Sequence, residues 1–112
     1  MENIIEIKSF NFAVRIVNLH KFLLKKKEHV LSKQVLRCGT SIGANIAEAE
    51  QAQSRADFVS KMSIALKEAS ETKYWLRLLK ATEYISTEEF NSIFNDCIEI
   101  EKILVSIIKS SK

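Results

Sequence analysis

The only two glycines of this 112-residue chain, Gly39 and Gly43, lie inside a stretch that otherwise has a helical pattern, and the chain has no proline. A glycine in a helix interior costs roughly 0.5–1 kcal/mol relative to alanine, so a pair is expected only where side chains must be absent. The spacing of four places both glycines on one helix face, with Ala47 one turn further on. The pattern predicts a strip of small residues that another backbone approaches closely.

The length and composition are typical of one folded domain, which we expect to span residues 1–112. Hydrophobic residues make up 46% of the chain and charged residues 28%, and no apolar run approaches the ~20 residues that span a bilayer. The first residues carry two acids before the first lysine and do not resemble a secretory signal. We therefore expect a cytoplasmic protein with no membrane partner, in which Cys38 and Cys97 are reduced.

The net charge of +3 conceals a gradient along the chain. Residues 1–40 carry eight Lys or Arg against three acids, whereas residues 81–112 carry three against six. This asymmetry fits nucleic-acid binding by the basic part, and it fits self-association between unlike surfaces equally well. Charge alone does not choose between these two interpretations.

Apolar residues recur with the helical period in the first half of the chain. A first helix is expected over residues 10–24, followed by lysines that suit the negative end of its dipole. Ser32 is expected to cap a second helix that ends near Ala52. The first helix carries two adjacent apolar stripes, Phe12, Ile16, Leu19 and Leu23 and beside them Ala13, Val17 and Leu24. The expected core positions of the second helix are Val35, Cys38, Ile42, Ile46 and Ala49.

Capping motifs mark the starts of two further helices. Ser54 with Asp57 predicts a helix that begins near Arg55, and Ser86 with Glu89 forms a capping box before a helix that continues to the C-terminus. Their expected core positions are Phe58, Met62, Ala65, Ala69, Thr72, Leu76, Leu79, Phe90, Ile93, Phe94, Cys97, Ile100, Leu104 and Ile107. Four helices joined by short turns predict an all-α protein, an antiparallel up-down-up-down four-helix bundle. The first and last helices are so apolar that we expect another copy to cover part of them.

Polar residues of the second and third helices predict a network between those helices. Its members are Arg37, Ser41, Asn45 and Glu48 on the second helix, spaced to share one face, and Lys61, Glu68 and Glu71 on the third. One interpretation is a polar pocket that grips a ligand or a phosphate. The other is an internal hydrogen-bond network that fixes helix register, with Arg37 paired to one of the glutamates.

Six cations surround the turn between the first two expected helices: Lys21, Lys25, Lys26, Lys27, Lys33 and Arg37. In a symmetric oligomer they would form a positive surface that holds phosphate backbone without reading sequence. A lysine-rich turn is also a common solvated helix end, and no aromatic residues interleave with these lysines to stack bases. Both interpretations stay open.

The sequence contains no nucleophile elbow, Walker loop or Cys/His zinc spacing, and no Glu-x-x-His motif of a di-iron bundle. We therefore expect no catalytic residue, no metal and no cofactor. The remaining alternative is an enzyme that uses Glu68 and Glu71 with a metal or a small molecule.

The run from Leu31 to Leu79 resembles the four-helix-bundle proteins encoded in intervening sequences of bacterial 23S ribosomal RNA genes. The family pattern occurs in order and at family spacing in Gln34, Arg37, Ser41, Ile42, Asn45, Glu48, Ser54, Asp57, Phe58, Ala65, Glu68, Glu71 and Leu76. The similarity extends over residues 10–108. Many members carry glycines after the position of Glu48, where this chain has Ala49 and Glu50.

The resemblance implies a cytoplasmic, non-enzymatic bundle that assembles as a ring, typically a homopentamer. The related accessory proteins of diversity-generating retroelements are similar in fold and bind nucleic acid through a basic surface. We therefore expect a homo-oligomer associated with RNA or another nucleic acid. The alternative is a structural or protein-interaction module with no nucleic-acid role.

Overall fold

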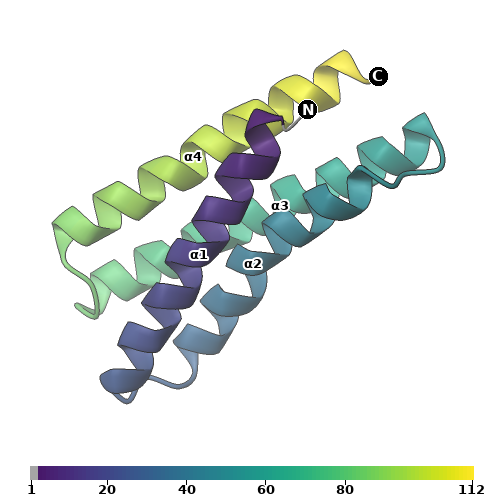
Figure 1. Ribbon diagram of the computed structural model, residues 1–112. Helices are drawn as coiled ribbons and strands as arrows, with labels where there is room; N and C mark the ends of the chain where they lie inside the picture. The colour runs from purple at the N-terminus through teal and green to yellow at the C-terminus, as the bar shows by residue number, and fades with distance from the viewer. Residues whose placement is uncertain (1–2) are drawn as a thin grey trace.

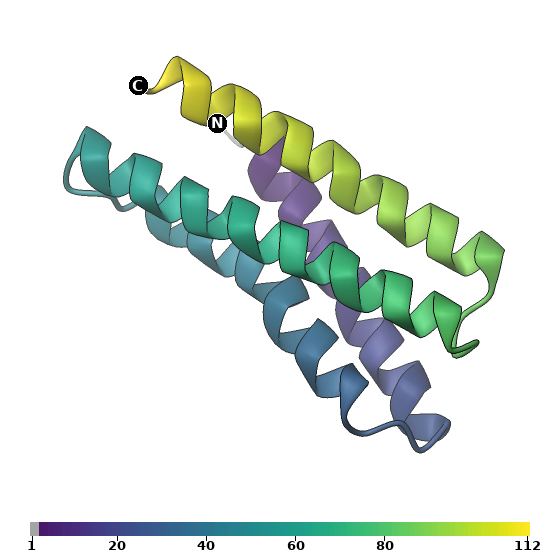
Figure 2. The same cartoon turned by 180° about the vertical axis from the view of Figure 1, so that it is seen from behind.

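The computed structural model describes residues 3–112 and consists of four helices, α1 (Ile4–Lys25), α2 (Leu31–Ala49), α3 (Arg55–Ala81) and α4 (Thr87–Ser110). Each helix runs opposite to the one before it, so the α1–α2 and α3–α4 turns lie at the same end of the molecule (Figure 1). Helix α1 contacts α2 and α4, and α3 contacts the same two helices from the other side (Figures 1 and 2). Within the described residues there is no strand. The predicted all-α four-helix fold is confirmed.

Helix α1 begins at Ile4, earlier than the predicted start at residue 10. The side-chain oxygen of Asn3 accepts a hydrogen bond from the backbone N–H of Glu6 at 3.0 Å, which caps the helix. The additional turns bury Ile5 and leave apolar residues exposed on the opposite face. Because apolar residues stand on both faces there, the sequence does not show a clear helical stripe in this segment.

The predicted Ser32 cap of α2 is wrong, because Ser32 lies inside the first turn and is buried. The helix is instead capped by the carboxylate of Glu28. It accepts hydrogen bonds from the backbone N–H groups of Val30, Leu31 and Ser32 at 3.1, 3.0 and 2.8 Å. Burial alone would raise the pKa of Glu28, but these three bonds outweigh it and lower the pKa. At its other end α2 stops at Ala49, before the predicted limit near Ala52.

The predicted starts of α3 and α4 are confirmed. The Ser54 hydroxyl accepts from the N–H of Asp57 at 3.0 Å, although the Asp57 carboxylate binds the N–H of Gln53 and not that of Ser54. Ser86 and Glu89 form the complete reciprocal capping box, with bonds of 2.9 and 3.1 Å. Asp at the third helical position is one methylene shorter than Glu, so the complete box forms only at α4.

Both turns at the shared end use left-handed residues that are not glycine. Lys27 has φ 62° and Glu83 has φ 66°. The next residue in each turn donates its N–H back to a carbonyl of the preceding helix, Glu28 to Leu23 at 2.9 Å and Tyr84 to Leu79 at 3.0 Å. These are the bonds of a Schellman motif, in which glycine is the usual left-handed residue.

Most predicted core positions are buried, which confirms the helical stripes. Leu19, Phe58, Phe94 and Ile107 are only partly buried and pack against the edge of the core. In the second stripe of the first helix Ala13 and Val17 are partly buried, and Leu24 is exposed because it lies in the last turn of α1, away from the core. The buried apolar positions are Ile5, Phe12, Ile16, Leu23, Val35, Cys38, Ile42, Ile46, Ala49, Met62, Ala65, Ala69, Leu76, Leu79, Ile85, Phe90, Ile93, Cys97, Ile100, Leu104 and Ile108.

The two cysteines are buried and free, as predicted. No Cα of α2 lies within 8 Å of a Cα of α4, so Cys38 and Cys97 are too far apart for a disulfide without movement of the backbone. Burial raises the pKa of the Cys38 thiol, and it raises that of Cys97 to about 12. Both side chains therefore act as small apolar core residues at neutral pH.

Candidate functional site

The two glycines of the predicted strip on α2 face α1, with Gly39 buried and Gly43 half-buried, whereas Ala47 is exposed. A Cβ atom at Gly39 would lie 2.7–2.9 Å from three side-chain atoms of Ile16. A Cβ at Gly43 would lie 3.4 Å from the backbone carbonyl oxygen of Ser9. The close approach of α1 to α2 therefore depends on the absence of a side chain at Gly39. At Gly43 the α1 backbone lies at an ordinary contact distance from the position that a Cβ would take.

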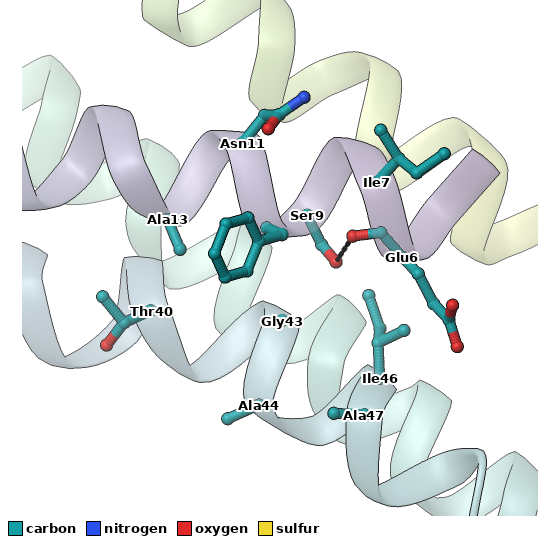
Figure 3. A pocket seen from close by; sticks show the side chains of 11 residues that line it. Glu6, Ile7, Ser9, Asn11, Ala13, Thr40, Gly43, Ala44, Ile46 and Ala47 are labelled. Atoms are coloured by element: carbon teal, nitrogen blue, oxygen red, sulfur yellow. Dashed lines mark hydrogen bonds between the residues drawn. The ribbon is translucent and has the colours of Figure 1, made fainter. Parts of the chain in front are cut away.

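Outside this contact, α1 and α2 form an open groove of about 650 Å³ (Figure 3). Ala44 and Ala47 of α2 and Ala13 of α1 line it, and the N-terminal end is bordered by Glu6 and Ile7 (Figure 3). Next to it lies a row of exposed apolar side chains, which we name the outer face of α1: Ile4, Ile7, Phe10 and Val14. Phe10 is 68% exposed, the largest of these side chains and one that also lines the groove. This face is the largest run of exposed apolar residues on a single helix in residues 3–112.

The predicted polar network contains one tight cluster at the α2–α3 boundary. The Arg37 guanidinium pairs with the carboxylate of Glu71 and lies 3.5 Å from that of Glu68. The indole N–H of Trp75 donates to Glu71 at 3.0 Å. That indole bond, together with Arg37, lowers the pKa of Glu71, although partial burial opposes the shift. One cation is thus shared by two half-buried carboxylates.

The other members of the predicted network form separate contacts. Asn45 donates to the carbonyl and hydroxyl oxygens of Ser41 at 2.9 and 3.1 Å, within α2 itself. Lys61 pairs with Glu48 at 3.4 Å. The structure therefore divides the seven predicted residues into three groups and does not assemble them into one pocket.

Two features of this boundary were not expected from the sequence. Trp75 belongs to the Arg37 cluster, and the four-residue spacing between Glu71 and Trp75 is a signal that could have identified it. The second carboxylate oxygen of Glu68 is buried and has no hydrogen-bond partner among the described residues. Its nearest charge is Arg37, whose N–H groups point to Glu71 and Gln34.

All six predicted basic residues are exposed, and five of them are lysines around the α1–α2 turn: Lys21, Lys25, Lys26, Lys27 and Lys33. Lys26 stacks over the Phe22 ring at 4.7 Å and donates to the carbonyl oxygen of Tyr84 at 3.4 Å, which joins this turn to the α3–α4 turn. None of the five takes part in a salt bridge with another described residue. Arg37 differs from them because its charge is held by Glu71 and Glu68.

Helix α4 is acidic, and three of its carboxylates are neutralised within the chain. Glu99 pairs with Lys8 at 2.8 Å, and Asp96 pairs with Arg15 at 2.6 Å. Glu101 pairs with Lys73 of α3 at 2.8 Å. Part of the charge gradient therefore serves contacts between helices of the same chain.

Among residues 3–112 no three His, Cys, Asp or Glu side chains are placed to share a metal ion. The same residues include no helix with the length and hydropathy needed to cross a bilayer.

A family model described as 23S rRNA-intervening sequence protein matches residues 1–106. The chain is also similar to a crystal structure of a protein with unknown function from the S23 ribosomal protein family of Bacteroides thetaiotaomicron VPI-5482. The two are 66% identical, with a TM-score of 0.94, over 95% of this chain and 99% of that one. No curated protein matches significantly.

Proposed function

We propose that this chain, which belongs to the 23S rRNA-intervening sequence protein family, is a self-assembling, RNA-associated bundle without catalytic activity. The Bacteroides protein is described as having unknown function, so the proposal depends on the surface of this chain. The observation that carries it is the group of five exposed lysines around the α1–α2 turn, none of which is in a salt bridge with another described residue. We name this group the lysine end, and we place the protein in the cytoplasm.

The lysine end suits phosphate binding because its charges are exposed and concentrated. Exposed lysines contribute little to folding, whereas each phosphate that they neutralise releases a condensed counterion and favours binding. Elsewhere many cations are already engaged: Lys8, Arg15 and Lys73 pair with acids of α4. Contacts of this kind hold the phosphate backbone and carry no sequence information.

Self-assembly is supported by the outer face of α1. Four apolar side chains at helical spacing remain exposed beside a groove lined by alanines and Gly43. Small residues let a second backbone or a protruding side chain such as Phe10 approach closely, and burial of this face removes apolar area from water. We propose a homo-oligomer, with the pentamer as the expected form.

The Arg37 cluster is assigned a structural role. Its guanidinium is held by two carboxylates and by the Gln34 oxygen at 3.3 Å, so it fixes the register of α2 against α3. This assignment leaves a second candidate function, a protein-interaction module without an RNA role. The observation that favours it is the outer face of α1, because that face by itself needs only a protein partner.

The test is RNA binding at several salt concentrations. Replacing Lys25, Lys26 and Lys27 together by glutamine should remove most of the affinity for RNA. The slope of the logarithm of the binding constant against the logarithm of the salt concentration should become shallower by about 0.7–0.9 for each lost phosphate contact. Replacing Lys102, Lys109 and Lys112 by glutamine is the matched control. It removes the same charge from exposed positions in the C-terminal half of α4 and just after it, away from the lysine end. Both triple variants should keep the oligomeric mass and the thermal stability of the parent.

A salt slope that is unchanged in the Lys25–27 variant, or reduced equally in the control, would remove the lysine end from the proposal. Absence of measurable RNA binding by the parent at low salt would favour the protein-interaction module.

A further inference from the structure

We infer that the groove between α3 and α4 is a stacking site for an unpaired nucleobase, with Tyr74 against the base and Arg77 and Lys80 on the adjoining phosphates. The inference depends on the proposed RNA association and adds a second contact region to it. The two helices that form this groove lie side by side (Figure 2).

The groove holds about 560 Å³, a size typical of ligand-sized clefts. Its apolar part is aromatic: the Phe90 and Phe94 rings stack with centroids 4.7 Å apart beside Leu78. Tyr74 stands at the rim and is 55% exposed, and its ring meets that of Trp75 edge to face at 5.1 Å. An exposed tyrosine ring thus lines the groove together with two stacked phenylalanine rings, and proteins that bind single-stranded nucleic acids use exposed aromatic side chains of this kind for stacking.

The charges around the groove fit an anion. Arg77 and Lys80 line it, and no lining residue is acidic. Lys80 lies 4.8 Å above the Phe90 ring, which holds its ammonium group at the groove, and neither it nor Arg77 is in a salt bridge with another described residue. Of the carboxylates close to the lining residues in the sequence, Glu71 is paired with Arg37, and Glu89 accepts the Ser86 N–H of the capping box. Glu83 lies outside the lining, in the α3–α4 turn. An apolar, aromatic surface with unneutralised cations complements a flat uncharged base joined to phosphate.

The groove also reaches the end of the bundle at which the lysine end lies. It extends to Lys80 and Ala81 in the last turn of α3, next to the α3–α4 turn. That turn is joined to the α1–α2 turn by the bond from Lys26 to the carbonyl oxygen of Tyr84 at 3.4 Å. A strand held by the lysine end therefore has the groove within reach along the same end of the bundle.

The experiment compares a short oligoadenylate RNA with an abasic oligomer of equal length and charge. Trp75, the only tryptophan, packs against Tyr74 and reports binding by its fluorescence. Stacking predicts that the parent binds oligoadenylate more tightly than the abasic oligomer and that Tyr74→Ala weakens oligoadenylate binding roughly 5- to 150-fold, with little change for the abasic oligomer. Tyr74→Phe should retain the preference, and Tyr74→Leu, which keeps the apolar contact with Trp75 but has no ring, should lose it.

Arg77→Gln should weaken both oligomers, and Lys109→Gln is its exposed control outside the groove. Equal binding of both oligomers by the parent, with the loss on neutralising Lys25–27 intact, would overturn the stacking site and leave the proposed RNA association standing. A preference unchanged in Tyr74→Ala and Tyr74→Leu would also overturn it. Failure of the parent to bind either oligomer would overturn the stacking site and the RNA association together.

Discussion

Gly39 and Gly43 share one face of α2 but meet different surroundings on α1. At Gly39 a methyl group would collide with the branched side chain of Ile16, where both γ carbons lie under 3 Å from the Cβ position. At Gly43 the nearest atom, the Ser9 carbonyl oxygen, lies at ordinary contact distance. The spacing of the two glycines predicts a shared close contact, but their unequal surroundings depend on the relative position of α1, which no pattern in the sequence specifies.

Alanine substitutions should therefore have different effects on stability at these two positions. Gly39→Ala is expected to lower the free energy of unfolding by about 1–3 kcal/mol, because Ile16 must leave its rotamer or the helices must separate. Gly43→Ala is expected to leave it unchanged or raise it by up to about 1 kcal/mol, since alanine is the better helix former. Urea unfolding of both variants measures these changes in the free energy of unfolding. Equal losses of stability at the two positions would show that Gly43 is as tightly packed as Gly39.

The helix ends show where a sequence motif succeeds and where it fails. Ser54 and Ser86 were identifiable because a cap contacts residues within three positions of itself. Glu28 was not identified, because glutamate is not one of the usual N-cap residues, although its carboxylate accepts from N–H groups only two to four positions further on. Lys27 and Glu83 replace the usual glycine in both turns, so neither turn carried the expected signal.

Removal of the Glu28 cap should destabilise the protein in a manner that depends on pH. Glu28→Ala is expected to lower the free energy of unfolding by about 0.5–2 kcal/mol at neutral pH, because three backbone N–H groups lose their acceptor. The folded pKa of Glu28 lies below its usual value of 4.5, so the contribution is complete above that value and disappears as the pH falls through the lower folded pKa.

Thermal unfolding across this pH range, with Glu88→Ala as the control, measures the effect. Glu88 is an exposed carboxylate in the first turn of α4 and does not take part in its capping box. The stability difference between parent and Glu28→Ala should shrink on acidification. A difference that stays constant down to the lowest pH would mean that the ionised carboxylate is not the group that stabilises the start of α2.

Across the whole molecule, the helical periodicity of the sequence was sufficient to predict the fold, but it did not predict how residues of different helices meet at the surface. The core stripes follow from the 3.6-residue period alone, because each helix has one face that must be buried. Which helices are neighbours decides that Lys8, Arg15 and Lys73 pair with acids of α4. It also decides that Tyr74 of α3 and Phe94 of α4 line one groove. Residues that are far apart in the sequence leave no local signal of such contacts.

The proposed function uses two surfaces of the molecule, the outer face of α1 for assembly and the lysine end for RNA. Assembly of copies would multiply the lysine ends in one particle, which raises the local positive potential and the apparent affinity for a polyanion. The proposed function therefore requires that assembly through the outer face of α1 and RNA binding by the lysine end occur in the same particle.

Light scattering of the purified chain, alone and with a structured RNA, tests this claim most directly because one measurement reports both assembly and partner. The account predicts a single oligomeric mass, expected to be that of a pentamer, and a heavier complex with RNA that dissociates as salt is raised. Phe10→Asp, which places a charge on the outer face of α1, should reduce the oligomer to smaller species. A monomeric mass for the parent, with no change on adding RNA at low salt, would contradict the account.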